Sequence, residues 1–148
     1  AFWRFFCIRM FMEFILHISI FSNLIMIGVS LITHYVTYPS FALIHKKLFN
    51  RFHNRYSNIM LIIVGPVMIF EFISTLILSF TYFNLLTLIS FILVLLIWFL
   101  TFFLIVPIHN KLELNFNKSL NKKLISYNGA RTMIWVIKFI LLLFLFES

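Results

Sequence analysis

The sequence predicts an all-α integral membrane protein, a four-helix bundle with two short interfacial amphipathic helices. Three observations lead to this prediction: the composition, four long apolar runs, and two basic connections between them. Of the 148 residues 63% are hydrophobic and 11% are charged, and the mean hydropathy is +1.07. No soluble domain of this size has an interior large enough to bury that much apolar surface. We therefore expect a single membrane domain over residues 1–148, with the lipid bilayer as its solvent.

Four apolar runs are each close to the length of a membrane crossing. An α-helix needs about 20 apolar residues to span the hydrocarbon core of a bilayer. The first three runs meet that length, and the fourth is shorter, so we expect it to begin in the interface. The predicted spans cover residues 12–36, 57–80, 85–106 and 130–146.

Prolines and turn residues predict where these spans end. The residue before a proline is disfavoured in the helical region, so Tyr38-Pro39 is expected to end the first span and Val106-Pro107 the third. The uncharged segment Thr81–Asn84 predicts a tight turn, and Asn128-Gly129 predicts another turn before the fourth span. Pro66 lies inside the second span, where we expect a kink.

Both long connections combine apolar residues at helical spacing with basic residues. This pattern is typical of amphipathic helices that lie in the membrane surface, so we expect one interfacial helix in each connection. The first connection carries Phe41, Ile44, Leu48 and Phe52 with Lys46, Lys47, Arg51 and Arg55. The second carries Leu112, Phe116, Leu120 and Leu124 with Lys111, Lys118, Lys122 and Lys123.

The distribution of charge predicts how the chain is oriented. Four spans place both basic connections on one side, and basic residues favour the cytoplasmic side of a membrane. We therefore expect both termini on the non-cytoplasmic side. The net charge of +8 is explained by this asymmetry and by attraction to anionic lipid, so nucleic acid is not expected as a partner.

Polar residues from every span lie at the same membrane level, near the basic connections. They are His34, Tyr38, His53, His109, Asn110, Asn128 and Arg131. Such a set could line a pocket for a metal, a haem edge, or an anionic or quinone-like head group. Taken singly, the same residues are also typical anchors of helix ends at the interface. No HxxxH or HExxH spacing supports a metal site, and the sequence leaves the cofactor unidentified.

Glu71 lies deep in the second span, where an ionised carboxylate is costly unless it is paired or hydrogen-bonded. Its possible partners are Asn23 and Ser22 on the first span and Lys138 on the fourth, whose stem could reach part of the way. Two interpretations stay open. Glu71 is a candidate catalytic acid that handles a proton, or it belongs to a structural buried pair.

Two tryptophans are predicted to lie in different surroundings. Trp98 lies too deep in the third span for the interface, so we expect it to pack in the bundle as a wall of the pocket. Trp135 lies one turn past Arg131 and is expected in the aromatic belt at the membrane interface.

The order of polar and proline motifs along the chain is a further observation. The motifs are Tyr38-Pro39, His53, Gly65-Pro66 with Glu71, Trp98 with Thr101, Val106 to Asn110, Asn128, Arg131-Thr132 and Trp135. This order resembles a widespread group of small uncharacterised bacterial four-span membrane proteins, and it is distantly similar to the anthrone-oxygenase-like domain family of unknown function. The resemblance implies a four-helix membrane bundle and the cofactor-free oxidation of an aromatic or quinone-like compound. That family more often has two asparagines where this chain has His109-Asn110.

The functional prediction is a polar pocket at the cytoplasmic helix ends that binds or oxidises a lipophilic aromatic or quinone-like ligand. In this hypothesis His53, His109 and Arg131 hold the head group, and Glu71 exchanges a proton. The alternative is a non-catalytic accessory subunit of a larger membrane complex, for example a respiratory one. Other membrane subunits, or further copies of this chain, are then the partners, and whether the protein is an enzyme is left open.

Overall fold

The computed structural model describes residues 2–147, which form helices with only short breaks between them. These residues form α-helices, two π-helical segments and one short 3-10 helix, and they contain no strand, so the predicted all-α class is confirmed for them. The elements are α1 (Phe2–Ile32), the π-helical η1 (Thr33–Thr37), α2 (Tyr38–Ser40), the 3-10 helix η2 (Phe41–Leu43), α3 (Lys46–Thr81), α4 (Leu85–Phe99), the π-helical η3 (Leu100–Ile105), α5 (Val106–Leu114) and α6 (Lys118–Glu147).

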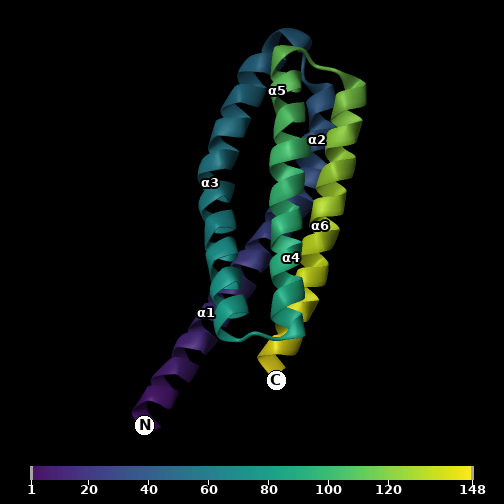
Figure 1. Cartoon of the computed structure of the whole chain (residues 1–148). Helices are drawn as coiled ribbons and strands as arrows, with labels where there is room; N and C mark the ends of the chain where they lie inside the picture. Colours follow the sequence, from purple (N-terminus) through teal and green to yellow (C-terminus); the bar gives the residue numbers. More distant parts are fainter. Residues whose placement is uncertain (1, 148) are drawn as a thin grey trace.

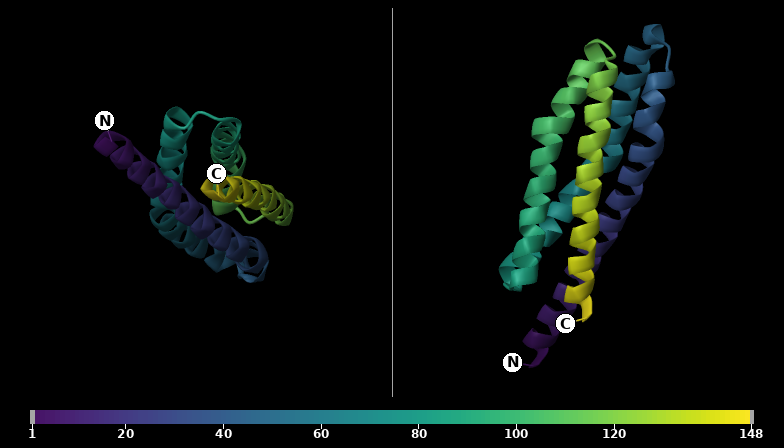
Figure 2. Two further views of the ribbon diagram at one scale, coloured as in Figure 1. Left: turned by 90° about the horizontal axis from the view of Figure 1, so that it is seen from below. Right: turned by 90° about the vertical axis from the view of Figure 1, so that its right-hand side faces the viewer.

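These elements form four long antiparallel rods. The first rod runs from α1 to η2, the second is α3, the third runs from α4 to α5, and the fourth is α6 (Figure 1). α1 packs against α3 and α6, and α4 packs against the same two helices, which closes the bundle. α3 continues through Pro66 and follows a bowed path in Figure 1. Figure 2 shows both termini at one end of the bundle, which we call the terminal end.

Each rod contains a stretch that is long and apolar enough to cross a membrane. These stretches are Phe6–Leu43, Lys46–Thr81, Leu85–Leu114 and Lys118–Phe146. They contain the four predicted spans and extend beyond them, since the rods continue into the predicted connections. The described part of the chain is therefore that of a multi-pass membrane protein.

Pro39 and Pro107 do not end their helices, so this prediction is wrong. A proline has no amide hydrogen, and its ring clashes with the carbonyl oxygen four residues earlier in an α-helix. In this structure a π-helical segment precedes each proline, at Thr33–Thr37 and at Leu100–Ile105. The wider π turn bonds residues five apart, and we infer that it moves that carbonyl away from the ring. The residue before each proline consequently keeps right-handed helical backbone angles.

The two predicted interfacial helices are not separate elements, and this prediction is also wrong. Residues 46–55 are the first turns of α3, and residues 118–127 are the first turns of α6. α6 continues through Asn128-Gly129 without the predicted turn. The chain instead breaks at Ile44, which is extended, and at Asn115–Asn117.

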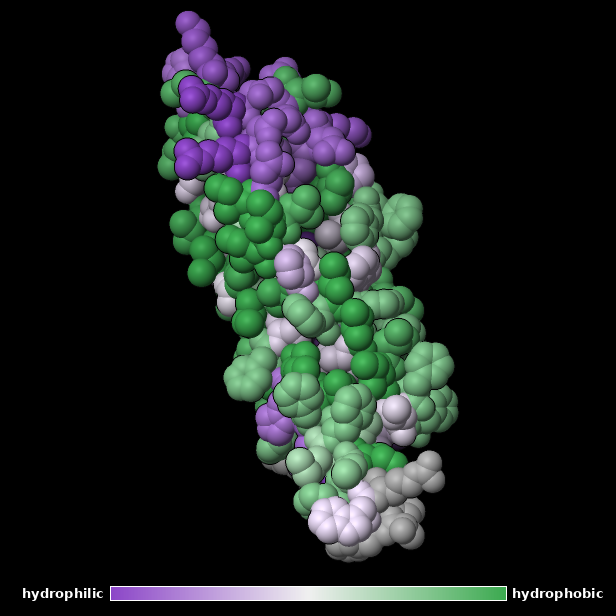
Figure 3. Space-filling model, turned by 90° about the vertical axis from the view of Figure 1, so that its left-hand side faces the viewer, coloured by the Kyte–Doolittle hydropathy of each residue, from purple (hydrophilic) through white to green (hydrophobic). Residues whose placement is uncertain are grey.

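Packing explains why these amphipathic stretches continue the rods. Part of their apolar residues face the bundle and join one buried cluster near the breaks, whereas Leu48 and Phe52 stay exposed. The members of this cluster are Tyr38, Phe41, Phe49, Ile105, Ile108, Leu112 and Leu124. The exposed faces of the same turns carry basic residues, and Figure 3 shows hydrophilic side chains gathered at this end of the molecule. We call it the basic end.

The interior of the bundle is polar along much of its length, whereas the face shown in Figure 3 is mainly apolar below the basic end. Most buried hydroxyl groups bond to backbone carbonyls or to other side chains, since a hydrocarbon surrounding offers them no water, while the Ser90 hydroxyl finds no partner among the described residues. The Ser19 and Thr75 hydroxyls lie 3.3 Å apart between α1 and α3. The Ser79 hydroxyl donates to the Thr87 carbonyl at 3.0 Å and so links α3 to α4.

The predicted tight turn between α3 and α4 is confirmed. The chain leaves α3 at Tyr82, and Asn84 precedes α4 with extended backbone angles. The Asn84 side chain accepts the amide hydrogen of Thr87 at 2.9 Å, and the Thr87 hydroxyl accepts that of Asn84 at 3.1 Å. This reciprocal capping box satisfies two amide groups near the helix start.

We expect Asn84→Ala to lower the free energy of unfolding by about 1 kcal/mol, because it removes the side-chain acceptor of the cap. Unfolding of the purified protein in SDS titrations, followed by circular dichroism, measures the change. Asn84→Ser keeps a capping oxygen and is the matched control. Equal losses in the two variants would contradict the assignment of the cap.

Candidate functional site

Glu71 is the centre of a buried polar cluster that joins three helices. Its Oε1 atom accepts hydrogen bonds from Lys138 at 3.0 Å and from Asn23 at 3.1 Å. Its Oε2 atom accepts the indole hydrogen of Trp135 at 3.0 Å. The predicted partners Asn23 and Lys138 are present, while Ser22 donates to the backbone of its own helix.

The Glu71–Lys138 contact is a fully buried ion pair. The side chains are 1% and 0% exposed, respectively. Burying either charge alone is costly, and the pair is tolerated because each charge compensates the other within hydrogen-bond distance. The sequence predicted that the Lys138 stem reaches only part of the way, but its ammonium lies at the carboxylate itself.

Trp135 does not lie in an aromatic belt, so that prediction is wrong. Its side chain is completely buried and packs with Met26, Met68 and Ile97 in the middle of the bundle. The bond to Glu71 explains this position, since a buried indole N–H needs an acceptor.

Arg131 lies above Trp135, on the side toward the basic end, and it is 8% exposed. Its guanidinium carbon is 4.9 Å from the centre of the Trp135 ring. Its Nη1 donates to the Thr101 hydroxyl at 3.1 Å, and its Nη2 donates to the Asn128 side-chain oxygen at 2.8 Å. Among the described residues no carboxylate pairs with Arg131, and its Nε finds no acceptor. This positive charge is therefore buried with neutral partners only.

Asn128 fixes Arg131 to the first rod. The Asn128 amide nitrogen donates to the Ser30 carbonyl at 3.0 Å, and its oxygen accepts from the Ser30 hydroxyl at 3.2 Å. The hydroxyls of Ser30 and Thr132 lie 2.6 Å apart. These bonds hold α1 and α6 together at the level of the guanidinium.

His53, His109 and Tyr38 form a hydrogen-bonded chain nearer the basic end. The His53 Nε2 and His109 Nδ1 atoms lie 2.9 Å apart, and the His109 Nε2 atom lies 3.0 Å from the Tyr38 hydroxyl. The rings come from α3, α5 and α2, so the chain crosses three of the four rods. The Tyr56 ring of α3 lies beside this chain, with ring centroids 6.4 Å from His109 and 5.4 Å from Phe41.

The two π-helical segments border this part of the bundle. η1 ends directly before Tyr38, and η3 contains Thr101, the acceptor of Arg131. π turns inside α-helices are frequent at functional sites, because they place side chains that a regular helix would direct elsewhere. Both segments lie beside the same polar groups, which favours this level as the functional one.

The structure brings together five of the predicted ligand-binding residues and leaves three apart. Tyr38, His53, His109, Asn128 and Arg131 belong to the polar interior. Asn110 is exposed. The His34 ring lies against Gly129, where an added Cβ would be 2.9 Å away from it. Trp98 is half-buried between Phe72 and Phe102, with its indole N–H unpaired among the described residues.

The polar residues of this region that were not predicted from the sequence include Ser30, Glu113 and Asn54. The Asn54 side chain donates to the Glu113 carboxylate at 3.0 Å, and Asn50 donates to the Glu113 carbonyl at 2.7 Å. The spacing of Asn50, Asn54 and Asn58 was a usable signal, since residues four apart form one stripe on a helix. Ser30 gave no comparable signal.

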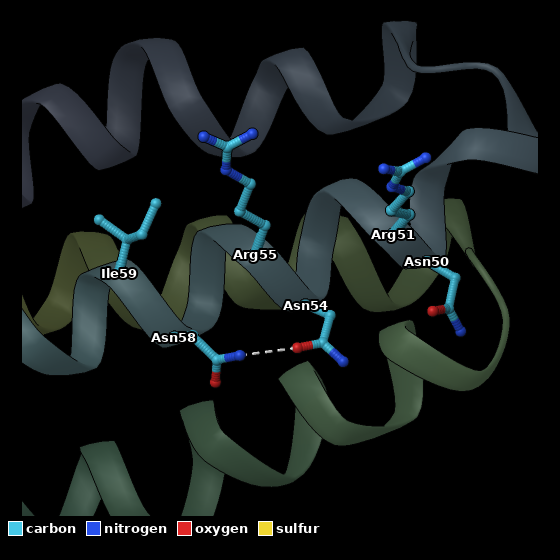
Figure 4. A pocket seen from close by; sticks show the side chains of 6 residues that line it. All are labelled: Asn50, Arg51, Asn54, Arg55, Asn58 and Ile59. Carbon is cyan, nitrogen blue, oxygen red and sulfur yellow. Dashed lines mark hydrogen bonds between the residues drawn. The ribbon is translucent and has the colours of Figure 1, made fainter.

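Two hollows lie away from the buried polar groups. A hollow of about 870 Å³ lies at the terminal end between α1, α3, α4 and α6, with Arg9, Glu13 and His17 among its lining residues. A shallow groove of about 600 Å³ follows α3 from Asn50 to Ile59 (Figure 4). Neither is lined by a predicted ligand-binding residue. Among the described residues no group of three or more His, Cys, Asp or Glu side chains is placed to hold a metal ion.

Comparison with known proteins gives no relative. No family model matches the chain, and no curated protein or solved structure matches it. The resemblance to small bacterial four-span proteins and to the anthrone-oxygenase-like family stays a prediction.

The ion pair of Glu71 should be detectable as an interaction energy. We expect Glu71→Gln and Lys138→Met each to lower the free energy of unfolding by about 3–5 kcal/mol. Glu71→Gln leaves the Lys138 ammonium buried without a counter-charge, and Lys138→Met leaves the Glu71 carboxylate in the same situation. The double variant should be more stable than Glu71→Gln alone, since it removes the unpaired ammonium. SDS unfolding of the four proteins measures the cycle.

The exposed pair Arg9–Glu13 provides the control for that cycle. Arg9→Gln should change the free energy of unfolding by less than about 1 kcal/mol. Purely additive effects of the two substitutions at Glu71 and Lys138 would contradict a direct buried pair.

Proposed function

We propose that this four-span membrane protein binds the electronegative, quinone-like or aromatic head group of a lipophilic ligand beside Arg131. In this proposal the basic end faces the cytoplasm and both termini face the opposite side, as the excess of Lys and Arg at that end favours. The tail of the ligand stays in the bilayer, and its head group lies in the polar interior.

The buried charge of Arg131 is the observation that carries the proposal. An arginine inside a membrane domain is costly unless it is paired, and such residues usually serve a ligand or a substrate path. Arg131 has two neutral acceptors and an aromatic face, and among the described residues it has no anion. A carbonyl or oxyanion of a ligand would supply the acceptor that its Nε lacks.

The surroundings of Arg131 favour an aromatic head group. Trp135 packs against the guanidinium, and the Tyr38 and Tyr56 rings lie next to the His109 ring, with ring centroids 5.5 and 6.4 Å from it. Flat rings pack well beside such side chains. Thr101, which holds the guanidinium, is only half-buried, so this polar group borders the membrane-facing surface of η3. A lipophilic molecule would enter from the bilayer between η3 and α6.

The proposal gives different roles to the other predicted residues. Glu71 compensates Lys138 and holds Trp135 in place below the guanidinium. His53 bonds to His109, and His109 bonds to Tyr38, so both histidines act on the head group through Tyr38.

An accessory subunit of a larger membrane complex is the second candidate function. The exposed polar groove on α3 favours it, since Arg51, Arg55 and Asn58 lie there without covering side chains from other rods. Purification from native membranes in a mild detergent separates the two candidates: stable association with other chains supports the subunit.

Arg131→Met tests the binding function. We expect the dissociation constant for lapachol, a prenylated hydroxynaphthoquinone, to rise about ten- to hundred-fold, because a charged hydrogen bond to the head group is lost. Quenching of tryptophan fluorescence measures binding, since Trp135 lies directly beside the guanidinium. The free energy of unfolding should stay the same or increase, because a costly buried charge is replaced by an apolar side chain.

Arg55→Met is the matched control, since it removes the same charge from the exposed basic end. It should leave lapachol binding unchanged. If Arg131→Met unfolds the protein while the folded fraction binds as the wild type does, Arg131 is structural and the proposal is wrong.

A further inference from the structure

In the hydrogen-bonded chain of His53, His109 and Tyr38, the two bonds of His109 are coupled to each other. Both ring nitrogens of His109 are engaged, one by His53 at 2.9 Å and one by Tyr38 at 3.0 Å. A neutral imidazole carries a hydrogen on one nitrogen and a lone pair on the other. The direction of one bond of His109 therefore determines the direction of its other bond.

The chain consequently has two states. In the first, His53 and His109 both carry hydrogen on Nε2, the bonds run from His53 toward Tyr38, and the Tyr38 hydroxyl is free to donate inward. In the second, both histidines carry hydrogen on Nδ1, and the Tyr38 hydroxyl donates to His109. Mixed tautomers would place two hydrogens or two lone pairs against each other between the rings.

The outer end of the chain lies near an acidic group at the basic end. His53 Nδ1 is buried and finds no hydrogen-bond partner among the described residues. Glu113 lies within electrostatic range of His53. Asn54 holds its carboxylate, and Asn54 also lines the open groove on α3, where Figure 4 shows it bonded to Asn58. Water therefore reaches the polar groups next to this carboxylate.

The inner end of the chain lies at the proposed head group. Tyr38 and Tyr56 both lie within electrostatic range of the Arg131 guanidinium, as does His109. The Tyr38 hydroxyl ends the chain beyond His109 Nε2, from which it lies 3.0 Å away. The charged and titratable groups around the chain are Glu113 at the outer end, Arg131 and Tyr56 at the inner end.

We propose that His53, His109 and Tyr38 form a proton relay between the basic end and the head group beside Arg131. The proposal rests on the function proposed above and narrows its ligand class to lipophilic weak acids, such as phenols and hydroxyquinones. Arg131 binds the oxyanion of such a ligand, and the relay supplies the proton that converts it into the neutral acid.

The transfer is balanced in protons and needs no change of oxidation state. One proton binds to His53 Nδ1 from the Glu113 side. The hydrogen on His53 Nε2 moves to His109 Nδ1, that on His109 Nε2 moves to the Tyr38 oxygen, and the former hydroxyl hydrogen of Tyr38 moves to the ligand oxyanion. One proton enters the chain, one leaves it, and the chain passes from its first state to its second.

Nitrogen-15 NMR of histidine-labelled protein in lipid bilayers tests the relay without a ligand. We expect His53 and His109 to show the same tautomer, and Tyr38→Phe to change the tautomer populations of both rings. His34, which lies against Gly129, is the control and should not change. Opposite tautomers, or an effect of Tyr38→Phe on His109 alone, would overturn the relay.

Acid-jump kinetics with bound lapachol test the transfer itself. The lapachol anion is red and its acid is yellow, so protonation is followed by absorbance in a stopped-flow instrument. His109→Phe should slow protonation of the bound anion at least about tenfold while leaving its final extent unchanged. His34→Phe should have the wild-type rate.

The two experiments separate the failure of the relay from the failure of the binding function. A wild-type rate in His109→Phe contradicts the relay and leaves lapachol binding intact. If lapachol does not bind to the wild type, the binding function fails, and the NMR measurement alone decides whether the coupled chain exists. Tyr38→Phe provides a second kinetic variant if His109→Phe does not fold, and it should slow protonation in the same way.

Discussion

The buried ion pair between Glu71 and Lys138 is the interaction on which the arrangement of the other polar groups depends. A hydrocarbon surrounding supplies no water, so buried donors and acceptors depend on the protein for their partners. Glu71 meets this requirement with donors from α1 and α6, and it thereby fixes three rods relative to each other. Trp135 is held by the same carboxylate, and Arg131 is placed over the Trp135 ring as a result.

The polar groups on the two sides of Trp135 differ in how completely they are satisfied. Below it, the carboxylate and ammonium neutralise each other. Above it, the guanidinium of Arg131 has neutral acceptors only among the described residues. Buried polar groups can specify how helices pack, but an uncompensated charge adds nothing to that role. For this reason Arg131, rather than Glu71, is the proposed ligand-binding group.

The two proline sites give this level of the bundle its geometry. A π-helical segment precedes each proline. The first is followed directly by Tyr38, the second contains Thr101, and both side chains belong to the polar interior. The same local solution thus occurs on the first and third rods. Continued helices carry His109 past the proline and into reach of His53, which a helix end at Pro107 would not do.

The sequence by itself determined the apolar helices, their number, the basic end, the tight turn at Asn84 and two partners of Glu71. These features follow from composition, charge and spacing, which act locally. It did not determine that the helices continue through Pro39 and Pro107, or that Trp135 is buried, because both outcomes depend on neighbouring rods. Only the tertiary structure decided that Asn110 and His34 stand apart while His53, His109 and Tyr38 join. Side chains from separate helices meet according to rotation and tilt, and packing sets both.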